Sequence, residues 1–164
     1  MKSKFEQLPN ELLYYVFDYF NGFEIFNSFY YLNQRFNFLL ENYRYTFKCL
    51  NWDEFVTLYF KIISHIPLQQ FKALSAKDNI GVEVDFFLNC FLTERNISQL
   101  SHLQTLQIIA NHSYKSITDN LEYAVKKLSQ LNNLIHLTIQ IPTLDLGVEL
   151  VQSVFSLTKL KSLS

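Results

Sequence analysis

Leucine recurs at every third position in four places along the chain, with phenylalanine once in the middle position. The four sets are Leu68/Phe71/Leu74, Leu100/Leu103/Leu106, Leu131/Leu134/Leu137 and Leu157/Leu160/Leu163. Their last members, at positions 74, 106, 137 and 163, are 32, 31 and 26 residues apart. A period of this length is typical of proteins built from stacked structural repeats. After three of the sets another apolar residue follows two positions later, at Ala76, Ile108 and Ile139, which predicts a short strand with one buried face in each repeat.

The segments between these predicted strands have apolar residues at every third or fourth position, which predicts helices over 52–66, 82–93, 117–130 and 144–157. Asn51 or Asp53 can cap the first of these helices, and Pro67 follows its end. Strands that alternate with helices predict an α/β fold with a parallel sheet.

The first forty residues have a different pattern, which predicts three short helices. Pro9 and Glu11 suit the first turn of a helix whose apolar face lies at positions 8, 12, 16, 17 and 20. Gly22 suits the end of that helix, because glycine tolerates positive φ. Two further helices are expected over 24–30 and 34–40, the second capped by Asn33. Such short helices cannot bury all their aromatic side chains among themselves, so a partner or the adjoining repeats must cover some of them.

Composition excludes several classes of protein. The chain has 164 residues, 49% of them hydrophobic, and a net charge of −1, which excludes intrinsic disorder and indicates neither nucleic acid nor an acidic membrane as partner. Three scattered glycines cannot form a glycine-rich phosphate loop, and two distant cysteines form neither a disulfide framework nor a zinc knuckle. No secretory signal or bilayer span is evident, so we expect an intracellular protein, cytoplasmic and/or nuclear.

No motif for catalysis is found. The four histidines have no metal-ligand spacing, and no G-x-S-x-G elbow exists. We therefore expect no enzyme, no catalytic residue, no cofactor and no metal.

Residues 5 to about 41 resemble an F-box. The resemblance rests on Leu8-Pro9-x-Glu11-Leu12-Leu13-x-x-Val16-Phe17-x-x-Phe20, Phe23-Glu24-Ile25-Phe26 and Leu32-Asn33-Gln34-Arg35-Phe36. In two repeats Asn79 and Asn111 complete the pattern L-x-x-L-x-L-x-x-N, which resembles the leucine-rich repeat, whereas the third repeat has Pro142 at this position. We expect an F-box-like helical module at 5–45 and a leucine-rich-repeat-like α/β solenoid with a parallel sheet at 46–164. No polar capping repeat follows Leu163, so an exposed apolar end, and with it a truncated fragment or self-association, is expected.

The resemblance implies a non-catalytic substrate adaptor of a Skp–cullin–F-box type ubiquitin ligase. In such an adaptor the F-box docks on the Skp-type linker protein of a cullin–RING ligase, and the repeats bind a protein target. Carried over by position, the candidate linker-binding residues are Leu8, Pro9, Leu12, Leu13, Val16, Phe17, Ile25, Leu32 and Phe36. The alternative for these side chains is that they pack on their own module.

The residues that alternate with the buried strand positions would line the concave face of the sheet. The candidate target-binding residues there are Ser75, Lys77, Thr105, Gln107, Ile109, His136, Thr138 and Gln140. A sheet that is merely solvated is the alternative for this face. The alternative for the whole protein is a leucine-rich-repeat interaction scaffold whose N-terminal helices only cap the solenoid.

Overall fold

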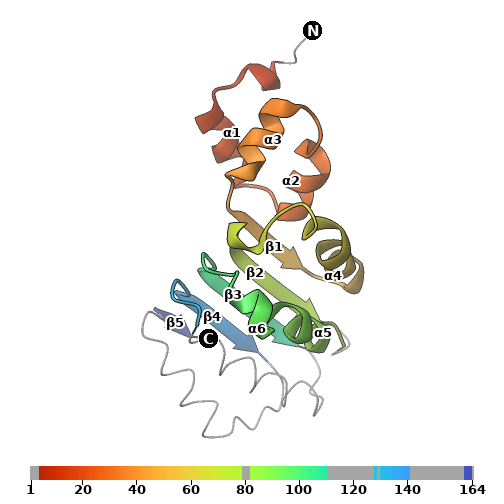
Figure 1. Ribbon diagram of the computed structural model, residues 1–164, viewed down its shortest axis with the longest axis vertical. Coiled ribbons are helices and arrows are strands. Elements are labelled where there is room, and N and C mark those ends of the chain that lie inside the picture. Colours follow the sequence, from red (N-terminus) through yellow and green to blue (C-terminus); the bar gives the residue numbers. More distant parts are fainter. Residues whose placement is uncertain (1–3, 79–81, 111–127, 129, 141–160, 164) are drawn as a thin grey trace, which may run out of the picture.

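The chain forms a mixed α/β structure around a five-stranded parallel sheet (Figure 1). The computed structural model describes residues 4–78, 82–110, 128, 130–140 and 161–163. The strands lie side by side in sequence order, and each pairs in parallel with the next. They are β1 (Tyr45–Cys49), β2 (Phe71–Asp78), β3 (Thr105–Ala110), β4 (His136–Gln140) and β5 (Ser162–Leu163).

The register of the sheet follows the leucine sets. Leu74 pairs with Leu106, Leu106 with Leu137, and Leu137 with Leu163. In the first three sets all nine side chains are buried. The prediction of parallel strands at these positions is therefore confirmed.

One backbone hydrogen bond is repeated at the entrance to consecutive strands. The Gln104 N–H donates to the Lys72 carbonyl, the Ile135 N–H to the Gln104 carbonyl, and the Lys161 N–H to the Ile135 carbonyl, each at 2.8 Å. Since β3, β4 and β5 each enter the sheet through the same bond, residues 72, 104, 135 and 161 occupy structurally equivalent positions.

The first strand, β1, was not predicted. Tyr45, Phe47 and Cys49 are buried and alternate with Thr46 and Lys48, which are not. This alternation is the expected signal of a half-buried strand, but it contains no leucine set and so falls outside the repeat. β1 pairs with β2 from Thr46 opposite Ala73 onward, after an irregularity next to Tyr45.

Three short helices precede the sheet, as predicted: α1 (Asn10–Phe17), α2 (Gly22–Phe29) and α3 (Gln34–Glu41), after a single 3₁₀ turn, η1 (Phe5–Gln7). The Asn33 side chain accepts a hydrogen bond from the Phe36 N–H at 3.1 Å and caps α3. The role predicted for Gly22 is wrong, because Gly22 is the first residue of α2 and does not end α1.

Helices that follow β1 and β2 cover one side of the sheet (Figure 1). They are α4 (Trp52–Thr57), the π-helical turn η2 (Leu58–Ile62) that continues it, the 3₁₀ turn η3 (Leu68–Gln70), α5 (Val82–Phe91) and α6 (Glu94–Ile97). Asn51, not Asp53, caps α4, since its side chain accepts from the Glu54 N–H at 2.9 Å. Several of the predictions lie outside the described residues. They are most of the helices predicted at 117–130 and 144–157, the turn residues Asn79, Asn111 and Pro142, and the expected apolar end at Leu157 and Leu160.

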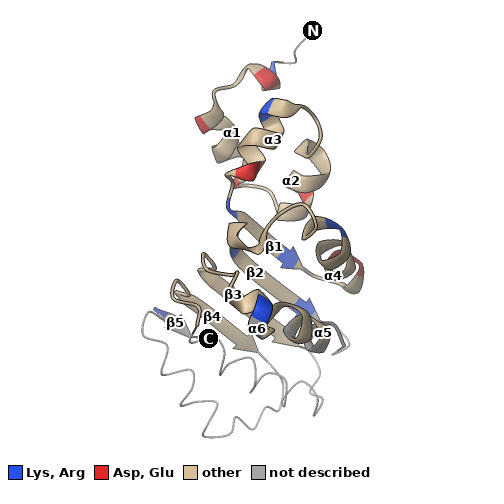
Figure 2. Cartoon of the chain, viewed as in Figure 1, with Lys and Arg blue, Asp and Glu red and all other residues tan. Residues whose placement is uncertain are grey.

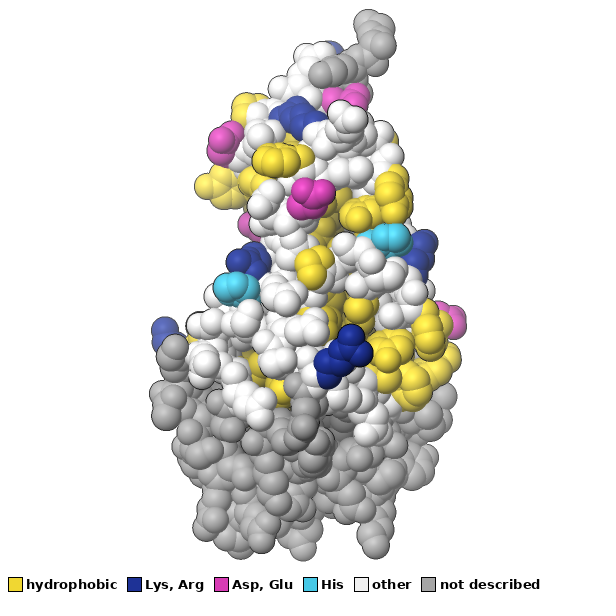
Figure 3. All heavy atoms as spheres, viewed as in Figure 1, with side chains coloured by type: hydrophobic (Ala, Val, Ile, Leu, Met, Phe, Trp, Pro, Cys, Tyr) yellow, Lys and Arg dark blue, Asp and Glu magenta, His cyan; other side chains and the backbone are white. Residues whose placement is uncertain are grey.

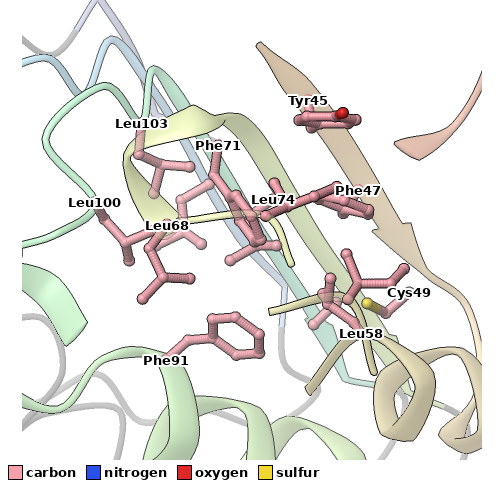
Figure 4. Packing of buried hydrophobic residues seen from close by; sticks show 14 of the residues in the cluster. Tyr45, Phe47, Cys49, Leu58, Leu68, Phe71, Leu74, Phe91, Leu100 and Leu103 are labelled. Atoms are coloured by element: carbon pink, nitrogen blue, oxygen red, sulfur yellow. The ribbon is translucent and has the colours of Figure 1, made fainter. Parts of the chain in front are cut away.

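The hydrophobic core runs without interruption from the helical module into the sheet. Figure 4 shows the part of it that lies between β1, β2 and Phe91 of α5. The Phe47 ring lies 5.6 Å from that of Tyr45 and 4.8 Å from that of Phe71, and the Phe23 ring of α2 packs edge-on against it at 5.4 Å. The boundary expected at residue 45 therefore does not separate two cores, because β1 packs against both parts.

Candidate functional site

The helical module exposes an unusual amount of apolar surface. In the described part of the chain, eleven large hydrophobic side chains are at least 36% exposed, and seven of them lie between residues 12 and 38. These seven, here called the module surface, are Leu12, Tyr15, Tyr19, Phe20, Tyr31, Leu32 and Phe38. Figure 3 shows hydrophobic side chains on the outside of this module. Exposed apolar side chains that gather on one part of a protein can mark an interaction site.

Only part of the predicted linker-binding set belongs to this surface. Leu13, Phe17, Ile25 and Phe36 are completely buried in the chain's own core. The Phe17 ring, for example, lies 5.1 Å from that of Phe29. These four side chains cannot contact a partner and are removed from the candidate docking set.

The other five predicted linker-binding residues remain accessible. Leu12 is 47% and Leu32 54% exposed. Pro9 is exposed as well, while Leu8 and Val16 are half-buried. The face of α1 that points away from the core therefore keeps part of the predicted docking set.

Arg35 holds this accessible set together. Its guanidinium donates to the backbone carbonyls of Glu6 and Leu8 and to Asn10 Oδ1, the last at 2.7 and 3.0 Å. Asn33 Nδ2 donates to Glu6 Oε1 at 2.8 Å. These bonds fix the segment that carries Leu8 and Pro9 beside the segment that carries Leu32, although more than twenty residues separate them.

The second candidate surface is the side of the sheet opposite the helices, here called the open face. Register places Thr46, Ala73, Thr105 and His136 in one row, Lys48, Ser75, Gln107 and Thr138 in the next, and Lys77, Ile109 and Gln140 in the third. These side chains are exposed or half-buried. All eight predicted target-binding residues thus lie on one face. Two of them are joined, since Ser75 Oγ donates to Gln107 Oε1 at 2.8 Å.

Sequence reasoning missed the part of the open face that β1 contributes. Thr46 and Lys48 of β1, together with Lys72, line a depression of about 360 Å³ where the sheet meets the helical module. The module side of this depression consists of Asp18, Tyr19, Phe20, Asn21 and Tyr43. The alternation in β1 was the available signal for it.

The junction between module and sheet is built from two close contacts. Asn21 Oδ1 accepts from the Lys48 N–H, and its Nδ2 donates to the Lys48 carbonyl, both at 3.2 Å. The side-chain amide thus takes the place of a neighbouring strand and closes the free edge of β1 at this residue. Next to it, Gly22 lies so close to the Phe47 ring that an added Cβ would be 2.4 Å from Phe47 Cε1.

The buried polar groups near the junction are kept neutral. Burial, and secondarily the Glu54 carboxylate, raises the pKa of Cys49 to about 12. Burial also raises the pKa of Tyr43, whose hydroxyl donates to Asp18 Oδ1 at 2.9 Å, and that of Tyr45, whose hydroxyl donates to the Leu40 carbonyl. Among the described residues, no three His, Cys, Asp or Glu side chains are placed to hold a metal ion.

A comparison of the chain with models of protein families, with curated proteins and with solved structures finds no match in any of the three. No described helix is both long and apolar enough to cross a membrane. The module surface and the open face are therefore the features from which a function is inferred.

Proposed function

We propose that this protein is the substrate-recognition adaptor of a Skp–cullin–F-box type ubiquitin ligase. The observation that carries the proposal is the module surface. The module fills its core with Leu13, Phe17, Ile25 and Phe36 and still leaves seven large apolar side chains exposed. Exposed leucine and tyrosine on a folded helical module are best explained by a partner that covers them.

The docking residues of this proposal are Pro9, Leu12 and Leu32, flanked by Leu8 and Val16. Within α1, Leu12 and Tyr15 are spaced at i and i+3, so they share one side of the helix. Such a stripe fits a hydrophobic groove on a partner. The F-box-like pattern in the sequence makes the Skp-type linker the partner we propose.

The sheet serves target capture in this proposal. The register of the leucine sets and the repeated hydrogen bond that links residues 72, 104, 135 and 161 support a leucine-rich-repeat-like solenoid. A solenoid of this kind binds its partners through the face of the sheet that the helices leave free. We assign the open face to the protein target.

One observation favours the alternative, a scaffold whose N-terminal helices only cap the sheet. The start of α2 closes the edge of β1 through Asn21 and packs on Phe47. These capping residues differ, however, from those of the module surface, which remain exposed with the cap in place. Capping of the sheet therefore accounts for the contacts of α2 but not for the exposure of Leu12 and Leu32.

Co-purification with a Skp-type linker protein tests the proposal. Leu12→Lys places a charge in the docking surface, and Leu50→Lys makes the same change at a leucine of nearly equal exposure (50%) at the far end of β1. We expect the parent protein to co-elute with the linker and Leu12→Lys to bind about tenfold more weakly or worse, because a charge is buried without a partner. Leu50→Lys should bind as the parent does.

Each other outcome decides against a part of the proposal. If the folded parent protein does not bind the linker, the scaffold function replaces the adaptor function. If both variants bind as tightly as the parent, the linker does not dock on the face of α1 that carries Leu12.

A further inference from the structure

The open face carries a cluster of positive charge that the overall composition hides. Lys48, Lys72 and Lys77 are all exposed on the first two strands, and Figure 2 shows basic residues on the ribbons of β1 and β2. None of the residues in the three rows of this face is acidic. The chain as a whole has a net charge of −1, so this cluster is not evident from the overall composition.

Register places Lys48 and Lys77 close together. Lys48 pairs with Ser75, and Lys77 lies two positions further along β2. Diagonal neighbours of this kind are about 8 Å apart. Lys72 lies at the irregularity in the pairing of β1 with β2 and lines the same depression as Lys48. It is five positions before Lys77, which corresponds to about 17 Å of extended chain.

The lysines have no carboxylate partner among the described residues; no ion pair forms with any of them. Asp18 is the one acidic residue that lines the depression beside Lys48 and Lys72, and one of its oxygens accepts from the Tyr43 hydroxyl. Like charges placed side by side on a sheet without a counter-charge destabilise it slightly. A ligand of opposite charge removes this repulsion and gains three attractive contacts.

We propose that the open face captures its target through an extended, acidic peptide segment whose carboxylates meet Lys48, Lys72 and Lys77. This inference rests on the proposed target-binding role of the face and specifies the chemistry of the target. The span from Lys72 to Lys77 matches about five residues of extended chain. Tyr19, which is 90% exposed, and Phe20 border the same depression, so the segment carries an apolar residue next to its acidic ones.

A protein segment fits the face better than nucleic acid does. The face has three lysines and no arginine, and none of its residues on β3 and β4 is a lysine or an arginine. A nucleic-acid surface needs a longer basic stripe to neutralise several phosphates. The lysines within the described strands lie on β1 and β2, next to the helical module, whereas Lys161 directly precedes β5 at the opposite edge of the sheet.

The test uses a fluorescein-labelled decapeptide in which glutamate alternates with serine around one central leucine. Its controls are the same peptide with glutamine in place of glutamate and a single-stranded DNA decamer. The double variant Lys48→Gln, Lys77→Gln removes two charges from the open face. The matched variant Lys61→Gln, Arg95→Gln removes two exposed charges from the helices, so both proteins have the same net charge.

Fluorescence anisotropy at low ionic strength should show binding of the glutamate peptide. We expect the open-face variant to weaken it about tenfold, added salt to weaken it further, and the helix variant to leave it unchanged. Circular dichroism confirms that both variants fold. Any of four results would overturn the inference. They are no binding of the glutamate peptide, equally tight binding of the glutamine peptide, tighter binding of the DNA than of the glutamate peptide, and equal losses of affinity in the two variants.

Linker co-elution is measured on the same proteins and separates the two proposals. If the parent protein binds the linker but not the glutamate peptide, the adaptor function stands and the acidic target does not. If it binds the peptide but not the linker, the open face captures acidic segments in a scaffold.

Discussion

Gly22 determines how closely the helical module approaches the sheet. A Cβ at this position would lie 2.4, 2.6 and 2.8 Å from Cε1, Cδ1 and Cζ of Phe47. Carbon atoms in van der Waals contact are about 3.5–4.0 Å apart, so the ring would have to move by about 1 Å. Phe47 is completely buried and surrounded by the rings of Phe23, Tyr45 and Phe71. It has no free space into which to move.

Gly22→Ala is therefore expected to destabilise the protein. At an unstrained helical position the change from glycine to alanine stabilises by about 0.4–1 kcal/mol. An extra methyl group in a well-packed core costs about 1–3 kcal/mol. We expect the second effect to exceed the first and the free energy of unfolding to fall by about 2 kcal/mol. Urea unfolding followed by circular dichroism measures this as a lower midpoint with an unchanged slope.

A smaller side chain at position 47 should rescue the variant. Phe47→Leu alone leaves a cavity and destabilises, but in Gly22→Ala, Phe47→Leu the new methyl group occupies part of that space. The double variant should therefore be more stable than the sum of the single effects by about 1 kcal/mol or more. The difference in stability between Asn27→Gly and Asn27→Ala, at an exposed position of α2, measures the helix-propensity gain from glycine to alanine alone. A neutral or stabilising Gly22→Ala, or strict additivity with Phe47→Leu, would refute the assigned packing.

Two further predictions concern the junction and the buried thiol. Asn21→Ala removes both hydrogen bonds to Lys48 and should lower the free energy of unfolding by about 1–2 kcal/mol. Asn21→Asp keeps the acceptor but loses the donor, so calorimetry should find its stability between those of the parent and Asn21→Ala. Equal stability of all three proteins would contradict the edge-closing role of Asn21. Native Cys90, which is half-buried, should react with a thiol reagent at pH 8, whereas Cys49, with its pKa raised from 9.0 to about 12, should react only on unfolding. The Cys49 thiol ionises at a lower pH in the unfolded chain, so its contribution to stability is complete below pH 9 and is lost as the pH rises from 9 to about 12. Cys49→Ala should therefore lose less stability than the parent over this range. Parallel pH profiles of stability for the two proteins would disprove the raised pKa of Cys49.

The module surface and the junction use different residues of the helical module. α2 carries the contacts that join module and sheet, through Asn21 and Gly22, whereas α1 and residues 31–38 carry the exposed apolar side chains. A partner that docks on α1 and residues 31–38 therefore leaves the junction undisturbed. In the proposed adaptor this separation holds the linker-binding helices in a fixed orientation relative to the target-binding sheet.

The repeat and the register of the sheet could be read from the amino-acid sequence. Leu74, Leu106 and Leu137 recur at nearly constant spacing, and a strand with one buried face shows alternating polarity whatever surrounds it. The same argument placed Gln107 and Thr138 on the open face. Local hydrogen bonding likewise predicted the cap at Asn33, since a cap depends on residues within one turn of the helix.

Other features depend on contacts between distant segments, and only the tertiary structure decided them. Apolar periodicity shows that Leu12 and Phe17 both belong to a helix, but the packing of α1 on its neighbours decides that Phe17 is buried and Leu12 exposed. Lys48 and Lys77 are 29 positions apart, and the pairing of β1 with β2 makes them neighbours. A linear pattern records how residues alternate, whereas burial and the electrostatic field depend on which segments meet in space.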